Sequence, residues 1–228
     1  MVTLQSGSSP GQRVKAGDTV IARARSVDMK PVKARFAAMK KVHGVYGAAN
    51  KRVADATLAV VKQERLAGEN DAVQDGTIDV LATAEVQAGA NRLKPLDAYK
   101  LGTVSALREM PVKAEANALI KLANKASKSK HAGVKKAAAA MLAAAEATLA
   151  SLKPIDALTK KRNEAIAERD ALAPSWERVF AALKRDVRNA ETDGAVGLFD
   201  ALFEVERPKA KVKAKVVKVL VVLSSSGG

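Results

Sequence analysis

The stretch that decides the fold is residues 31–60, PVKARFAAMKKVHGVYGAANKRVADATLAV. Apolar side chains recur through it at spacings of four and three residues, which is the repeat of one face of an α-helix. We therefore predict a single long amphipathic helix after Pro31, with a seam that is buried against other helices. The seam residues are Val32, Phe36, Met39, His43, Tyr46, Asn50, Val53, Thr57 and Val60.

Two features qualify this helix. Every second seam position from His43 onward is polar, and in a coiled coil such buried polar positions fix the register and the number of partners. Gly44 and Gly47 lie within the same stretch. Because glycine weakens a helix interior, we expect a local break near these two residues.

Similar periodic segments follow at residues 77–93, 96–110, 112–126, 137–150 and 155–187. Prolines stand at or near the start of several of these segments, where a missing N–H group costs no hydrogen bond. The prolines that mark these helix starts are Pro31, Pro95, Pro111, Pro154 and Pro174. Since Pro174 also falls inside the last segment, it should kink or divide that helix.

The two ends of the chain differ from this pattern. Residues 19–27, TVIARARSV, are rich in β-branched side chains, and residues 211–217 alternate lysine with valine or alanine before the run VLVVL at 219–223. Both ends therefore favour β-strands. An unpaired VLVVL edge invites aggregation, so we expect it to pair, either with the other terminal strand or with a strand of a neighbouring chain.

These patterns predict a mainly all-α fold. We expect an elongated bundle of about four to six helices, with short β segments at the N- and C-termini. The expected organisation is an N-terminal arm over residues 1–28, a helical bundle over 29–206 and a basic tail over 207–228.

The chain contains no cysteine. This excludes disulfides, thiolate metal sites, iron–sulfur clusters and cysteine nucleophiles together, and it fits a reducing compartment. The first residues lack the basic and apolar regions of a secretory signal, and no apolar run approaches the roughly 20 residues of a membrane span. We therefore expect a cytoplasmic protein with no membrane span.

Residues suited to catalysis are sparse. His43 and His131 are the two histidines of the chain, and neither has a partner at metal-ligand spacing. Asp71, Asp75 and Asp79 are spaced by four, but they lack the pattern of a calcium loop and are typical of a helix start. The glycine-rich nucleotide motifs and the GxSxG nucleophile motif are also absent. The sequence therefore predicts no enzyme, no cofactor and no metal site.

The formal net charge is +15, from 39 basic and 24 acidic residues. Such a charge attracts acidic partners such as nucleic acid, anionic lipid or an acidic protein, although lysines also simply solvate helices rich in alanine. Aromatic residues are not interleaved with the lysines, so any contact should be with the phosphate backbone and independent of sequence. The candidate polyanion-binding residues are Lys30, Lys33, Lys40, Lys41, Lys121, Lys125, Lys128, Lys135, Lys209, Lys211, Lys213, Lys215 and Lys218.

Two functions compete on this basis. The first is a non-enzymatic helical scaffold that self-associates or docks into a larger complex through apolar seams and terminal strands. The alternative is a sequence-independent nucleic-acid-binding protein that uses its lysine stripes and basic tail. The candidate assembly residues are Val20, Ile21, Phe36, Met39, Tyr46, Trp176, Val219, Leu220, Val221 and Val222.

Overall fold

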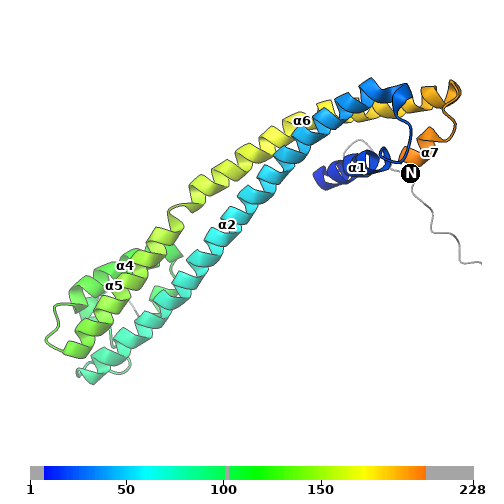
Figure 1. The fold of residues 1–228 in the computed structure, drawn as a ribbon. Coiled ribbons are helices and arrows are strands. Elements are labelled where there is room, and N and C mark those ends of the chain that lie inside the picture. The colour runs from blue at the N-terminus through cyan, green and yellow to red at the C-terminus, as the bar shows by residue number, and fades with distance from the viewer. Residues whose placement is uncertain (1–7, 101–102, 204–228) are drawn as a thin grey trace, which may run out of the picture. The chain divides into compact units, whose positions relative to one another are not determined.

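The computed structural model describes residues 8–100 and 103–203. Within these residues the fold is all-α, its helices pack as a bundle, and no strand occurs. The described residues divide into two compact units, the first formed by residues 8–40 and 180–203 and the second by residues 41–100 and 103–179. The helices are α1 (Pro10–Arg23), α2 (Lys33–Gln87), α3 (Val104–Arg108), α4 (Val112–Ala126), α5 (Ala132–Leu152), α6 (Ile155–Thr192) and α7 (Leu198–Phe203), with 3-10 turns η1 (Lys30–Val32) and η2 (Asp97–Tyr99) (Figure 1).

The predicted N-terminal strand is wrong, because most of residues 19–27 belong to helix α1 or to the turn after it. The helix starts with a capping box. The Ser9 hydroxyl accepts a hydrogen bond from the backbone N–H of Gln12, and the side-chain oxygen of Gln12 accepts one from the backbone N–H of Ser9. Pro10 occupies the first turn. This start satisfies the free amides of the first turn and outweighs the weak β-propensity of the residues that follow.

The predicted C-terminal strand over residues 211–223 lies outside the described residues.

The first unit has a small aromatic core. Phe180 of α6 meets Phe203 of α7 edge-to-face, with ring centroids 5.8 Å apart, and Phe199 lies 5.2 Å from Phe203. Helix α1 is fastened to α7 by a hydrogen bond of 3.4 Å from the Arg23 guanidinium to the Leu202 carbonyl. Aromatic packing therefore holds α7 against α6, and the Arg23 hydrogen bond joins α1 to α7.

The long helix predicted after Pro31 is confirmed as α2, and it extends further than expected. It runs without interruption past both glycines and through the segment predicted to begin a second helix at Thr77. Of the seam, Val32, Met39, His43, Tyr46 and Val60 are buried, and the remaining members are half-buried. The packing of these side chains offsets the roughly 1 kcal/mol that each helical glycine costs.

In the second unit α2 runs antiparallel to α5 and α6. Going along α2, the Arg52 guanidinium pairs with Glu168 of α6 at 2.9 Å, and the Gln63 amide donates to the Ser151 carbonyl of α5 at 2.6 Å. Further on, the Asn70 amide donates to the Ala147 carbonyl at 3.3 Å. Residue numbers thus fall on one side as they rise on the other, which defines a helical hairpin.

The main core of this unit lies between α2, α4 and α5. Helices α4 and α5 lie side by side (Figure 1). Leu119 and Leu122 of α4 and Met141 of α5 are fully buried, together with Ile78 and Leu81 of α2. Many facing positions are alanine, and small side chains allow the two helices to approach closely.

The predicted helix-start prolines differ in where they lie relative to the helices. Pro111 caps α4, Pro154 lies directly before α6, and Pro31 lies in the short turn η1. After Pro95 the chain forms only the short turn η2 and helix α3 instead of the longer helix predicted over 96–110. Pro174 lies inside α6 and does not divide it. Its ring is exposed, and the neighbouring helical turns are held by packing.

Candidate assembly face

The side of α2 that faces away from the core carries large apolar side chains. Their exposed fractions are 67% for Leu58, 44% for Leu66, 62% for Val73 and 55% for Val80. Leu66, Val73 and Val80 are spaced by seven residues, and Leu58 lies eight before Leu66, so all four share one face of the helix. We call these four side chains the outer face of α2.

Charged side chains lie within the same face. Lys62 falls between Leu58 and Leu66, and Glu69 falls between Leu66 and Val73. Beside them, Arg65 Nε lies 3.6 Å from Glu69 Oε1, one helical turn away. The outer face therefore alternates apolar and charged positions along about four turns of helix.

The sequence-based candidates for assembly lie elsewhere. Val20, Met39, Tyr46 and Trp176 are buried within the chain, and Ile21 and Phe36 are half-buried. A partner cannot reach the buried four in this structure. The remaining candidates, Val219, Leu220, Val221 and Val222, lie outside the described residues.

The outer face was not predicted from the sequence, because its apolar pattern runs along the same helix as the stronger pattern of the inward seam. The inward seam of α2 includes the aromatic residues Phe36 and Tyr46 and is the stronger apolar pattern in this part of the sequence. The seven-residue spacing of Leu66, Val73 and Val80 was visible in the sequence. It would have indicated a second apolar face if both sides of the helix had been counted.

Buried rings connect α2 with α6 in the second unit. Trp176 Nε1 donates a hydrogen bond of 3.1 Å to His43 Nδ1, and the Trp176 ring lies 5.9 Å from the ring of Tyr46. His43 is buried, in agreement with its predicted place on the seam. This contact places the imidazole in the core, beside an indole ring.

A group of acidic side chains is partly enclosed between α2 and α4. Glu115 of α4 is only 3% exposed, and burial together with the neighbouring Asp75 raises its pKa to about 7. Burial and Asp75 also raise the pKa of Asp71. Gln74 is buried on the same side of α2, and its side-chain amide partly opposes the upward shift in the pKa of Glu115.

Asp79, the third of the predicted aspartate series, is directed to a different partner. Its carboxylate pairs with the Arg108 guanidinium at 2.6 Å. Among the residues that the structure describes, no group of three or more acidic or histidine side chains is arranged to hold a metal ion.

The lysines of α4 and α5 gather around the turn that joins these helices. Lys121, Lys125, Lys128 and Lys135 are all exposed, as are the adjacent Lys130 and Lys136. No acidic residue occurs from 116 to 145, so the positive charge here has no counter-charge nearby in the sequence. Lys125 Nζ donates a hydrogen bond of 3.0 Å to the Tyr99 carbonyl.

The other lysine candidates are separate from this group. Lys30, Lys33, Lys40 and Lys41 are exposed along η1 and the start of α2. The tail candidates Lys209, Lys211, Lys213, Lys215 and Lys218 lie outside the described residues.

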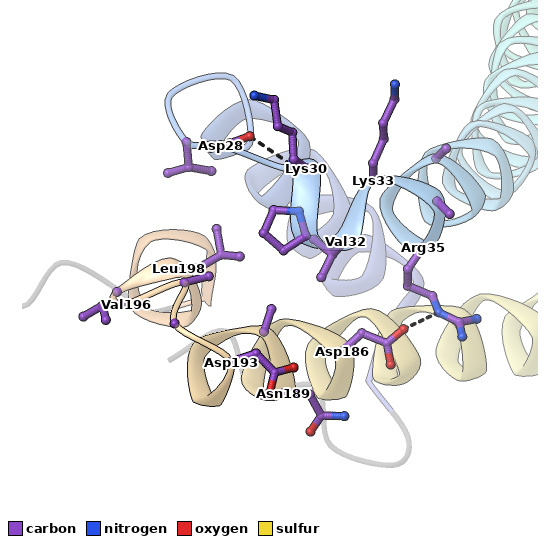
Figure 2. Close-up of a pocket in the computed structure, with 18 of the residues that line it drawn as sticks. Asp28, Lys30, Val32, Lys33, Arg35, Asp186, Asn189, Asp193, Val196 and Leu198 are labelled. Carbon is purple, nitrogen blue, oxygen red and sulfur yellow. Dashed lines mark hydrogen bonds and ion pairs between the residues drawn. The ribbon is translucent and has the colours of Figure 1, made fainter.

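An open cavity of about 1660 Å³ lies in the first unit (Figure 2). One side is formed by η1 and the start of α2, and the other by the end of α6 and the loop that follows it. Its apolar lining includes Val32 and Leu198. Charges at its edge neutralise each other, since Arg35 Nε lies 2.8 Å from Asp186 Oδ2. Figure 2 shows Lys30 and Lys33 extending away from Asp186 and Asn189 of α6. The cavity therefore presents no converging set of reactive groups.

One helical stretch, residues 132–192, is long and apolar enough in composition to cross a membrane. Much of its apolar character comes from alanine, and its α5 part packs against α4. A single stretch of this kind is weak evidence for a span, so the predicted lack of one remains a prediction.

Comparison of the chain with protein-family models, with curated proteins and with solved structures gives no match.

Proposed function

We propose that the protein is a non-enzymatic assembly protein that contacts its partner through the outer face of α2. The observation that carries this proposal is the line of exposed Leu58, Leu66, Val73 and Val80 on one helix. Single exposed apolar residues are common on protein surfaces, whereas a row of them on one face marks an interaction site. An amphipathic helix face of this kind suits a helix-to-helix contact.

Energetics favour the same conclusion. Covering a fully exposed leucine or valine side chain contributes roughly 1.5–3 kcal/mol. Because the four side chains are 44–67% exposed, together they supply roughly 3–6 kcal/mol. This sum reaches the lower end of the roughly 4–15 kcal/mol that association costs in lost translational and rotational freedom. The alternation with charged residues keeps the free surface soluble and gives the contact a specific alignment.

The non-enzymatic part of the proposal rests on the chemistry of the side chains. The chain has no cysteine, and His43 is engaged with Trp176 in the core. The acidic group around Glu115 has no nucleophile or histidine among the groups that perturb it. General acid–base catalysis needs such groups to converge on a substrate.

Replacing Leu66 or Val73 by glutamate should reduce the mass of the complex that the full-length chain forms in an extract of its own cells. A buried charge at a helix contact is unfavourable by several kcal/mol, so the complex should dissociate. Native mass spectrometry or light scattering after size-exclusion chromatography measures the mass.

The matched control is Leu93→Glu, because Leu93 is 89% exposed and lies beyond the end of α2. Circular dichroism establishes that each variant keeps its helical content. An unchanged complex mass for both the Leu66 and the Val73 variants would contradict the proposed function.

A second candidate function is binding of nucleic acid through the lysines at the turn between α4 and α5. The observation that favours it is the exposed group Lys121, Lys128 and Lys135 in a region without acidic residues. Each phosphate neutralised by a lysine releases a counterion, so binding should weaken steeply as salt rises.

Replacing Lys121, Lys128 and Lys135 together by glutamine should lower the slope of log affinity against log salt by about 2–3. Fluorescence anisotropy with a DNA duplex, from about 50 to 200 mM salt, measures this slope. Lys15→Gln, Lys94→Gln and Lys160→Gln remove the same charge at dispersed exposed positions and serve as the control. Equal slopes for both triple variants would exclude a role for this lysine group.

A further inference from the structure

We infer that the partner of the outer face of α2 is a second copy of the chain, aligned antiparallel about a two-fold axis close to Leu66. This inference rests on the proposed function and names its partner. It follows from the order of side chains along the part of the outer face from residue 58 to residue 73, which reads Leu58, Lys62, Leu66, Glu69 and Val73.

The order is self-complementary when the helix is reversed. Around a point between residues 65 and 66, Leu58 and Val73 are equally distant, and so are Lys62 and Glu69. An antiparallel second copy therefore places Leu58 against Val73 of the other chain and Lys62 against Glu69 of the other chain. A two-fold axis makes each contact twice, as in an isologous dimer.

The exposure of these residues agrees with this pairing. Leu58 and Val73, which would cover each other, are the most exposed of the four apolar residues, at 67% and 62%. Leu66 lies beside the axis, where it would meet its own counterpart. The segment from Leu58 to Val73 spans about 22 Å of helix, and α2 is continuous through it.

Charge decides the direction of the second helix. In a parallel alignment Lys62 would face Lys62 and Glu69 would face Glu69, which is unfavourable. In the antiparallel alignment both pairs are attractive. Arg65 comes near its own counterpart at the axis, and each Arg65 keeps Glu69 of its own chain 3.6 Å away as a counter-charge.

Charge reversal tests the pairing on the purified full-length chain. Lys62→Glu alone or Glu69→Lys alone creates two like-charge pairs per dimer, so each should raise the dissociation constant at least about tenfold. An equimolar mixture of the two variants restores both attractive pairs and should associate within about threefold of the original chain. Analytical ultracentrifugation at low salt measures the constants, and Lys160→Glu, at an exposed position on α6, is the control.

Cross-linking tests the direction independently, because the chain has no cysteine of its own. Antiparallel pairing predicts a disulfide between a Leu58→Cys chain and a Val73→Cys chain under mild oxidation. Neither variant should cross-link efficiently to itself. Self-linking of both variants, with no preference for the mixture, would show a parallel pair and overturn the inference.

The outcomes separate this inference from the proposed function. If the purified chain stays monomeric up to about 100 μM, the second copy is not the partner and the inference is wrong. The same holds if the chain dimerises and the charge reversals leave the dissociation constant unchanged. The proposed function would still stand in either case if Leu66→Glu reduces the mass of the complex in the extract.

Discussion

Replacing Trp176 by alanine is expected to lower the free energy of unfolding by about 3–5 kcal/mol, the usual loss for a large aromatic side chain in a core. The ring is almost fully buried, packs against Tyr46 and donates its indole hydrogen to His43. Removing it leaves a cavity and takes away the donor of a buried acceptor, and nothing nearby can fill both places. Urea unfolding followed by circular dichroism measures the change.

One further variant separates the loss of packing from the loss of the hydrogen bond, and a second serves as a control. Trp176→Phe keeps most of the apolar volume but leaves His43 Nδ1 without its indole donor, which should cost about 1–3 kcal/mol. Ser175→Ala alters the neighbouring exposed position and should have little effect. A loss below about 1 kcal/mol for Trp176→Ala would mean that α2 and α6 do not meet at this ring.

Replacing Glu115 by glutamine should make stability less dependent on pH. Burial and Asp75 raise the pKa of Glu115 to about 7 from an ordinary value of 4.5. Below pH 4.5 the carboxyl group is protonated in both the folded and unfolded chain. Between pH 4.5 and about 7 it is protonated mainly in the folded chain, so stability falls as pH rises, and above 7 the full cost of the buried charge remains.

The size of this effect is on the order of 3 kcal/mol at pH 8, from the change in pKa. The glutamine variant should therefore be more stable than the original chain at pH 8, and close to it in stability near pH 4. Urea unfolding across this range measures the difference, with Glu146→Gln as an exposed acidic control on α5. A difference of equal size at pH 4 and pH 8 would show that ionisation of Glu115 is not its cause.

The sequence predicted the main helix of the fold but not all of its extent. The seam from Val32 to Val60 identified α2 and placed His43 in the core, because a four-and-three spacing depends only on helix geometry. The break expected at Gly44 and Gly47 does not occur. Glycine acts locally, whereas the buried Tyr46 and Met39 stabilise the helix on either side through tertiary contacts.

The N-terminal segment was misassigned for a related reason. Residues 19–27 contain β-branched side chains, and this favoured a strand, although β-propensity depends strongly on context. The helical start lies ten residues earlier, at Ser9 and Pro10. A capping box of serine and glutamine is less apparent in a sequence than a run of apolar residues, yet it fixes the first turn of α1.

The proposed contact surface on α2 is the part that the sequence pattern indicates least directly. Apolar seam residues such as Met39 and Tyr46 were assigned to assembly, but they turned out to build the core. A sequence shows which side chains are apolar, but it does not show which of two apolar faces of a helix is buried in the folded chain. That choice depends on the antiparallel return of α5 and α6 along α2, which brings together residues as remote in sequence as Arg52 and Glu168.

Pro174 has a consequence for how α6 acquires its structure. Proline carries no amide hydrogen, so it leaves the carbonyl of Asp170 without its helical donor and weakens the nucleation of helix across that turn. Across this turn the backbone hydrogen-bond ladder of α6 is therefore incomplete, and side-chain burial, with Trp176 two residues further on, contributes what the missing bond does not.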